Sequence, residues 1–218
     1  MDLQQIESCL DSTDPQSRMK AITELRRFEP EVVVPLLKRR MHDEVFICRS
    51  FVAMGLGNKR NDEGFQALLE IIQYETDPNV ISEAANSLGK FGSQAIPHLV
   101  ALFERNSHWL VRQSIFATLE DIERPEVFLR LCRLGFNGDD LTVKQAAIVN
   151  LGRLKETPQA SEAMDILLEA TGHDAAFIRA SAARILRYFG GQPAEAALAK
   201  LQQDSDYRVV RAALEGLM

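Results

Sequence analysis

Apolar residues recur along the chain at the spacing of amphipathic helices. Within residues 64–75, Phe65, Leu68, Leu69 and Ile72 occupy positions i, i+3, i+4 and i+7, which line one helix face. The same kind of spacing predicts helices over residues 3–10, 30–41, 64–75, 95–105, 125–136, 161–171 and 193–202. No convincing alternating strand pattern accompanies them, so the pattern predicts an all-α protein.

A second kind of segment alternates with these helices and repeats a common pattern of residue types. Residues 77–92 read DPNVISEAANSLGKFG, and residues 140–152 read DLTVKQAAIVNLG. Each has a polar cap, an aliphatic three residues later, an often basic residue next, and a large aliphatic eight after the first. Seven stretches fit, and their paired positions are Ser17 (a departure) with Leu25, Phe46 with Met54, Val80 with Leu88, Val111 with Leu119, Val143 with Leu151, Ile178 with Leu186, and Val209 with Leu217 or, equally, Val210 with Met218. Because the closing positions follow one another at intervals of 29 to 35 residues, the chain is predicted to be a repeat array.

Capping residues divide each repeat into two helices. Glycines at 89, 92, 190 and 191 are placed to end helices, since glycine enters the left-handed conformation without penalty. Aspartates that can accept hydrogen bonds from the free amides of second helices are Asp14, Asp43, Asp77, Asp140 and Asp206. A hairpin of about thirty residues buries both apolar faces only by stacking on its neighbours. We therefore predict a right-handed α-solenoid of about seven helical hairpins, forming a single domain over residues 1–218.

The repeated pattern resembles HEAT repeats. Its valine-arginine step is carried by Val111–Arg112, Val143–Lys144 and Ile178–Arg179, whereas the first two repeats depart from it with Ser17–Arg18 and Phe46–Ile47. The short repeat is similar to the HEAT-like subclass of phycobiliprotein (phycocyanobilin) lyase subunits and phycobilisome degradation proteins of cyanobacteria. This resemblance covers essentially the whole chain.

Composition narrows the functional classes. The net charge of -6 opposes nucleic acid and acidic membrane surfaces as partners. The start of the chain has no secretory pattern, and no apolar run is long enough to cross a membrane. Cys9, Cys48 and Cys132 are widely separated, which is typical of a reducing compartment. We expect a cytoplasmic protein without membrane insertion.

No motif predicts a catalytic, cofactor or metal site. The four histidines lie in different repeats, and HExxH, CxxC and phosphate-loop strings are absent from the sequence. Residues 57–64, GNKRNDEG, are expected to form the longest polar connection. The sequence therefore predicts no cofactor and favours a non-enzymatic protein, although the enzymatic question stays open.

The expected binding surface is the concave face of the solenoid, formed by second helices. Positions two and six after each first aliphatic are expected to line this face, where they form a mostly uncharged strip that a helix or protein edge can contact. Trp109, the only tryptophan, is a candidate hot spot, or else packs between repeats. Together the candidate protein-binding residues are Ser82, Asn86, Trp109, Gln113, Gln145, Val149 and Arg184.

Two further sets of side chains allow a structural or a functional interpretation. Cys48 falls two positions after Phe46, on the side expected to face away from the core, where Arg49 would lower its pKa; it is a candidate reactive thiol or a packed one. Cys9 and Cys132 are expected in the core. The recurring basic residues either bridge neighbouring repeats or form a ligand-binding ladder, and they are Arg18, Arg112, Lys144, Arg179 and Arg211.

Three functions are compatible with this pattern. The preferred one is a protein-binding adaptor or chaperone-like assembly scaffold, whose partner the resemblance implies to be a phycobiliprotein or an assembly factor. The resemblance also implies a bilin lyase or isomerase subunit as an alternative. A third is a partner of an iron-sulfur cluster carrier, with Cys48 at the interface.

Overall fold

The regular structure of this protein is helical throughout the described residues. The computed structural model describes residues 1–119 and 124–215, and within them it contains fourteen α-helices and three short 3-10 segments. The chain divides into two compact units, Met1–Ile122 (unit 1) and Glu123–Met218 (unit 2). The all-α prediction is confirmed, whereas a single continuous domain stays a prediction.

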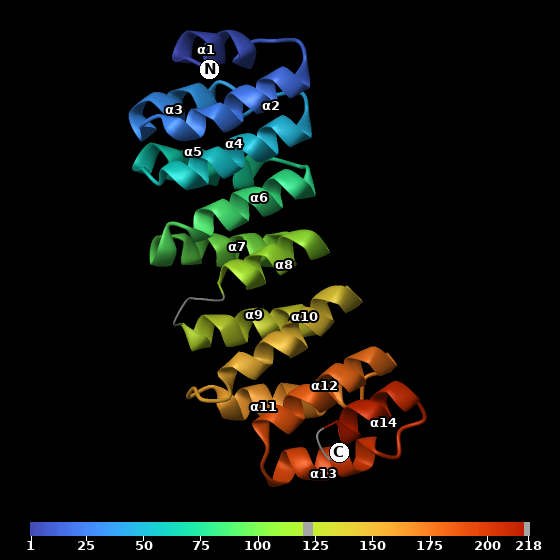
Figure 1. The fold of residues 1–218 in the computed structure, drawn as a ribbon. Coiled ribbons are helices and arrows are strands. Elements are labelled where there is room, and N and C mark those ends of the chain that lie inside the picture. Colours follow the sequence, from blue (N-terminus) through green and yellow to red (C-terminus); the bar gives the residue numbers. More distant parts are fainter. Residues whose placement is uncertain (120–123, 216–218) are drawn as a thin grey trace. The chain divides into compact units, whose positions relative to one another are not determined.

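Unit 1 consists of four helical hairpins (Figure 1). The second helices α2, α4, α6 and α8 pack in succession, and each also packs against the first helix of its own hairpin. The helices are α1 (Leu3–Leu10), α2 (Pro15–Glu24), α3 (Pro30–Lys38), α4 (Phe46–Lys59), α5 (Asp62–Tyr74), α6 (Pro78–Gly89), α7 (Ile96–Arg105) and α8 (Trp109–Thr118).

Unit 2 contains three hairpins of the same kind. Its second helices α10, α12 and α14 again pack in succession. The helices are α9 (Pro125–Asn137), α10 (Leu141–Leu151), α11 (Ala160–Ala170), α12 (Ala176–Phe189), α13 (Gln192–Leu201) and α14 (Tyr207–Leu214). The predicted α-solenoid of about seven hairpins is therefore confirmed.

Most of the predicted helix caps are present. Asp14, Asp77, Asp140 and Asp206 are N-caps whose carboxylates accept hydrogen bonds from backbone amides of the first turn. Asp43 differs, because the N-cap of α4 is Val45 and Asp43 lies two residues before it. Its carboxylate accepts one hydrogen bond from the Val45 amide, 3.0 Å away, and otherwise binds arginines.

The predicted register of the second repeat is wrong by two residues. The repeat pattern assigns Phe46 and Met54 to the paired apolar positions, but they are 40% and 39% exposed, whereas Cys48 and Leu56 are completely buried. Cys48 is the third residue after the N-cap of its helix, as Val80 is in α6. Several neighbouring apolar residues near the start of α4 satisfy the helical period, and only packing selects the buried pair. Leu217 and Met218, the closing candidates of the last repeat, lie outside the described residues.

The predicted polar connection at 57–64 is also shorter than expected. Helix α4 continues to Lys59, and only Arg60, with φ of 40°, and Asn61 separate it from α5. Gly57 is buried inside α4, where an added Cβ would lie 2.8 Å from the Ser87 Cα of α6. This glycine therefore serves close helix packing instead of a turn.

Candidate functional site

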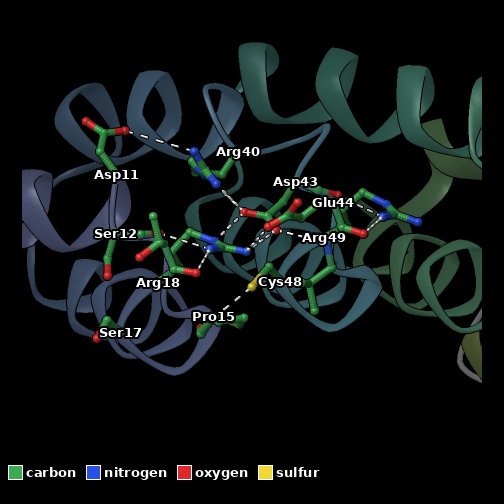
Figure 2. Close-up of polar contacts among 12 residues, drawn as sticks. Asp11, Ser12, Pro15, Ser17, Arg18, Arg40, Asp43, Glu44, Cys48 and Arg49 are labelled. Carbon is green, nitrogen blue, oxygen red and sulfur yellow. Dashed lines mark hydrogen bonds and ion pairs between the residues drawn. The ribbon is translucent and has the colours of Figure 1, made fainter.

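The polar centre of unit 1 is a buried ion pair between Arg18 of α2 and Asp43 (Figure 2). The Nε and Nη2 of Arg18 donate to the two carboxylate oxygens of Asp43, each at 2.8 Å. Its Nη1 donates to the carbonyl oxygens of Ser12 and Thr13, at 2.9 and 3.1 Å. The Arg18 and Asp43 side chains are only 2% and 0% exposed. The pair thus joins the first hairpin to the second in a site closed to water.

A second cation completes this centre. The Nε of Arg40 donates a hydrogen bond to the Asp43 carboxylate at 3.1 Å, and the Nη2 of Arg40 donates a second one to the same carboxylate. Burial raises the pKa of Asp43, but the hydrogen bonds from Arg18, from the Val45 amide and from Arg40 outweigh burial and lower this pKa to about 2. Asp43 is therefore an anion held by two guanidinium groups.

The Arg18 arrangement recurs at two other hairpin junctions. Nε and Nη2 of Arg49 donate to Glu75 at 2.6 and 3.1 Å, and those of Arg179 donate to Asp204 at 2.7 and 2.8 Å. In each case Nη1 donates to the carbonyl oxygens of the turn before its own helix. We call these three pairs the arginine ladder. Each arginine is the fourth residue after an N-cap, and each acid lies two residues before the next N-cap.

Of the recurring basic residues, Arg18 and Arg179 bridge neighbouring repeats, as the structural interpretation predicts. Arg112 and Lys144 donate to carbonyl oxygens before their own helices, Asn106 at 3.0 Å and Phe136 at 2.6 Å. The sequence pattern missed Arg49, because the misplaced register put Ile47 at the basic position.

The accessible-thiol hypothesis for Cys48 is wrong. Cys48 is completely buried, and its Sγ lies 3.8 Å from the carbonyl oxygen of Pro15. Burial and the nearby Asp43 carboxylate raise its pKa, so the thiol is held in its neutral form. Arg49 does not activate it, since that guanidinium binds Glu75. Cys132 is buried as expected, and Cys9 is half-buried.

The candidate binding residues of unit 1 differ in their exposure. Ser82 is buried, with 5% of its surface exposed, because α6 packs between α4 and α8; its predicted place on an open face is wrong. Asn86 is exposed and accepts a hydrogen bond from the Thr118 hydroxyl at 3.2 Å. Gln113 is half-buried.

Trp109 is exposed at the first position of α8. Its side chain is 43% accessible, and its ring stacks on that of His108 with a centroid distance of 6.0 Å. Of the two alternatives for this residue, this exposure favours a surface position over packing between repeats. Its role in binding stays a prediction.

The candidate residues of unit 2 lie on one face. Gln145 of α10 and Arg184 of α12 line the same open cavity of about 290 Å³, and Val149 of α10 is 51% exposed. The other residues lining this cavity are Phe177, Ala180, Tyr207, Arg208 and Arg211. Sequence reasoning missed Tyr207 and Arg208. The predicted binding strip consists of the positions two and six after the first aliphatic of each repeat. Applied to Val209 of the last repeat, the same rule would have found Arg211 and Glu215.

Two further properties of the described residues concern metal binding and membrane spanning. Within residues 1–119 and 124–215, no group of three or more histidine, cysteine or acidic side chains is arranged to hold a metal ion. Over the same residues, no helix has the length and apolar character needed to span a membrane.

The chain belongs to the HEAT-repeat family. The family model for HEAT repeats matches residues 46–120 and 130–218, more than half of the sequence. A search of curated proteins finds no match.

Solved structures with a similar fold include proteins of different kinds. The Escherichia coli protein YibA aligns with a TM-score of 0.66 at 16% identity, covering 97% of this chain and 80% of that one. A structure of the complex of CpcE and CpcF of phycocyanin lyase from Nostoc aligns with a TM-score of 0.54 at 19% identity, covering 100% and 87%. An engineered protein gives a TM-score of 0.51 at 19% identity, covering 98% and 67%. The resemblance to phycobiliprotein lyase subunits is thus confirmed in the fold.

Proposed function

We propose that this HEAT-repeat protein is a non-enzymatic adaptor or assembly scaffold that binds another protein through the exposed faces of its second helices. The observation that carries this proposal is the exposure of large apolar side chains on those helices. They include Phe46, Met54 and Trp109 in unit 1, and Val149 and Tyr207 in unit 2. Covering apolar surface of this kind with a partner removes it from water, which favours binding.

The arginine ladder supports a scaffold in a second way. The three ladder arginines are engaged with carboxylates and turn carbonyls, so their role is to fix three of the hairpins against the hairpins that follow them. A rigid array presents its exposed side chains without a large ordering cost on binding. These arginines and their carboxylates thereby stabilise the packing of neighbouring hairpins.

The resemblance to phycobilisome-related HEAT-like proteins supports a phycobiliprotein or one of its assembly factors as the partner. All three cysteines are free, which fits a reducing compartment such as the cytoplasm. The iron-sulfur alternative assigned Cys48 to an interface, and the burial of that thiol speaks against it.

The proposal is tested by affinity capture from native extract with matched pairs of variants. We expect Trp109→Ala and Val149→Asp to lose a captured polypeptide partner. Tyr74→Ala and Leu134→Asp are the controls, since these exposed residues lie on first helices of the same two units, and both should retain it.

Equal capture by all four variants would reject the proposal. Purified protein mixed with bilin and an apo-phycobiliprotein provides a separate readout. A covalent adduct with a shifted absorption spectrum would favour the lyase-type alternative instead.

A further inference from the structure

The cavity formed by α10, α12 and α14 in unit 2 is positively charged, against the overall charge of the chain. Three arginines line it, Arg184, Arg208 and Arg211, and the lining residues include no carboxylate. The whole chain carries a net charge of -6, so this concentration of guanidinium groups is a local exception. We call this site the arginine cavity.

Two carboxylates at the rim of the arginine cavity partly neutralise it. Glu215 accepts a hydrogen bond from the Arg184 Nε at 3.1 Å and lies 3.6 Å from the Arg211 Nε. Asp206 binds the Nη2 of Arg208 at 2.7 Å. Three guanidinium groups thus face two carboxylates, which leaves one positive charge in excess. All three arginine side chains are at least half exposed, and ion pairs at such positions contribute little free energy, so incoming carboxylates can replace these contacts at low cost.

The arginine cavity also has an apolar component. Phe177 and Ala180 of α12 belong to its lining, and Tyr207 at the start of α14 is 76% exposed. Its volume of about 290 Å³ is at the small end of ligand sites, a size suited to one large side chain. Tyrosine and arginine are, with tryptophan, the residue types most enriched among the residues that dominate binding energy at protein interfaces.

We propose that the arginine cavity binds an acidic segment of a partner protein. One aromatic or aliphatic side chain of the segment enters between Phe177 and Tyr207, and flanking carboxylates pair with the three arginines. Guanidinium groups pair with carboxylates through two parallel hydrogen bonds, which gives such a contact direction as well as attraction. A long nucleic acid is disfavoured, because the net negative charge of the chain repels it. This inference rests on the proposed function and specifies the chemistry of the partner.

A fluorescence-polarisation assay on the full chain tests the inference directly. The probe is a fluorescein-labelled synthetic peptide with one phenylalanine between two runs of three glutamates. The matched peptide replaces every glutamate with glutamine. We expect the acidic peptide to bind at least about tenfold more tightly than the glutamine peptide, the ratio expected for one charge-assisted hydrogen bond. Added salt should weaken only the acidic peptide.

Three variants assign this binding to the arginine cavity. Arg184→Gln combined with Arg211→Gln should weaken the acidic peptide about tenfold. Arg133→Gln is the control, since Arg133 of α9 is an equally exposed arginine paired with Glu162 outside the cavity, and it should leave the affinity unchanged. Glu215→Gln should strengthen binding about threefold, because it removes the carboxylate that competes for Arg184 and Arg211.

Three results would overturn the inference: equal binding of the two peptides, unchanged affinity of the double variant, or tighter binding of a single-stranded oligonucleotide than of the acidic peptide. The adaptor proposal is judged separately. If Trp109→Ala and Val149→Asp abolish capture while the arginine variants leave peptide affinity unchanged, the adaptor proposal is supported and the acidic-segment inference is rejected. If the acidic peptide binds but no second-helix variant affects capture, the adaptor proposal fails and the peptide site remains.

Discussion

An ion pair of the same geometry occurs in both units of this protein, in two environments that differ in solvent exposure. Arg18–Asp43 in unit 1 and Arg179–Asp204 in unit 2 share the same pattern of hydrogen bonds to the carboxylate and to turn carbonyls. The first pair is 2% and 0% exposed, and the second is 15% and 10% exposed. Arg40 adds a second cation to Asp43.

Because the two pairs share their bonding geometry and differ in burial, we expect burial to set the energetic importance of each pair. A carboxylate closed to water must keep its partners, because an unpaired buried charge is very unfavourable. A pair that water reaches can replace a lost hydrogen bond with solvent. Identical repeat positions are therefore expected to respond differently to the same substitution.

The largest expected effect is that of Arg18→Ala. Removing the guanidinium leaves Asp43 buried with Arg40 alone, and we expect the free energy of unfolding to fall by about 3 kcal/mol. Trp109 is the only tryptophan and lies in unit 1, so its fluorescence during urea unfolding reports on this unit. Arg39→Ala is the control: this 46% exposed arginine pairs with Asp11, and its loss should change stability by less than about 0.5 kcal/mol. Similar losses for the two variants would contradict the role of burial.

A smaller effect is expected on acidification. Asp43 has a pKa of about 2, below its ordinary value of 3.8, so its ion pair stabilises the fold fully above the ordinary value and is lost as the pH falls through about 2. Asp43→Asn removes this titration but is destabilised at neutral pH. The difference in unfolding free energy between wild type and Asp43→Asn should therefore shrink by about 2 kcal/mol between pH 5 and pH 2. A constant difference over this range would show that folding does not lower the pKa of Asp43.

Arg179→Ala should cost less than Arg18→Ala. We expect about 1.5 kcal/mol, the contribution of hydrogen bonds to a charged group that water partly reaches. Hydrogen exchange of the α12 and α14 amides follows unit 2, which contains no tryptophan. If Arg179→Ala proves as costly as Arg18→Ala, the bonding pattern matters more than its burial.

The smallest effect is expected for Cys48→Val. The corresponding residue beside the Arg179–Asp204 pair is Val209, and both residues are completely buried. Because valine fills this position elsewhere in the repeat, the change should shift stability by less than about 1.5 kcal/mol. Thiol labelling offers a second readout: wild-type Cys48 should react only when unit 1 unfolds. Rapid labelling of the native protein at Cys48 would overturn its assignment as a packed thiol.

The repeat architecture could be predicted from the sequence because it rests on local signals. The aspartate caps, the glycines at 92, 190 and 191, and the helical period of the first helices are each read within a few residues. The predicted segment 3–10 matches α1 at both ends, and the segment 125–136 matches α9 to within one residue. Stacking then follows, since no single hairpin can bury its own apolar faces.

The sites depend on packing between segments that are distant in sequence. The period allowed either Phe46 or Cys48 as the buried residue of α4, and contact with α2 and α6 decided for Cys48. Ser82 matched the pattern of an open face, but α6 has neighbours on both sides. Gln145 and Arg184 were correctly placed on a shared face, whereas Tyr207 was missed because its exposure depends on where α14 lies against α12.

The sequence by itself determined that this protein is a series of helical hairpins, because caps, helix period and repeat length are local properties that each segment carries. Only the tertiary structure decided which arginine is closed to water, which thiol is inert and which side chains gather around the arginine cavity. These properties depend on the solvent exposure of each group, and that exposure is created when neighbouring hairpins pack.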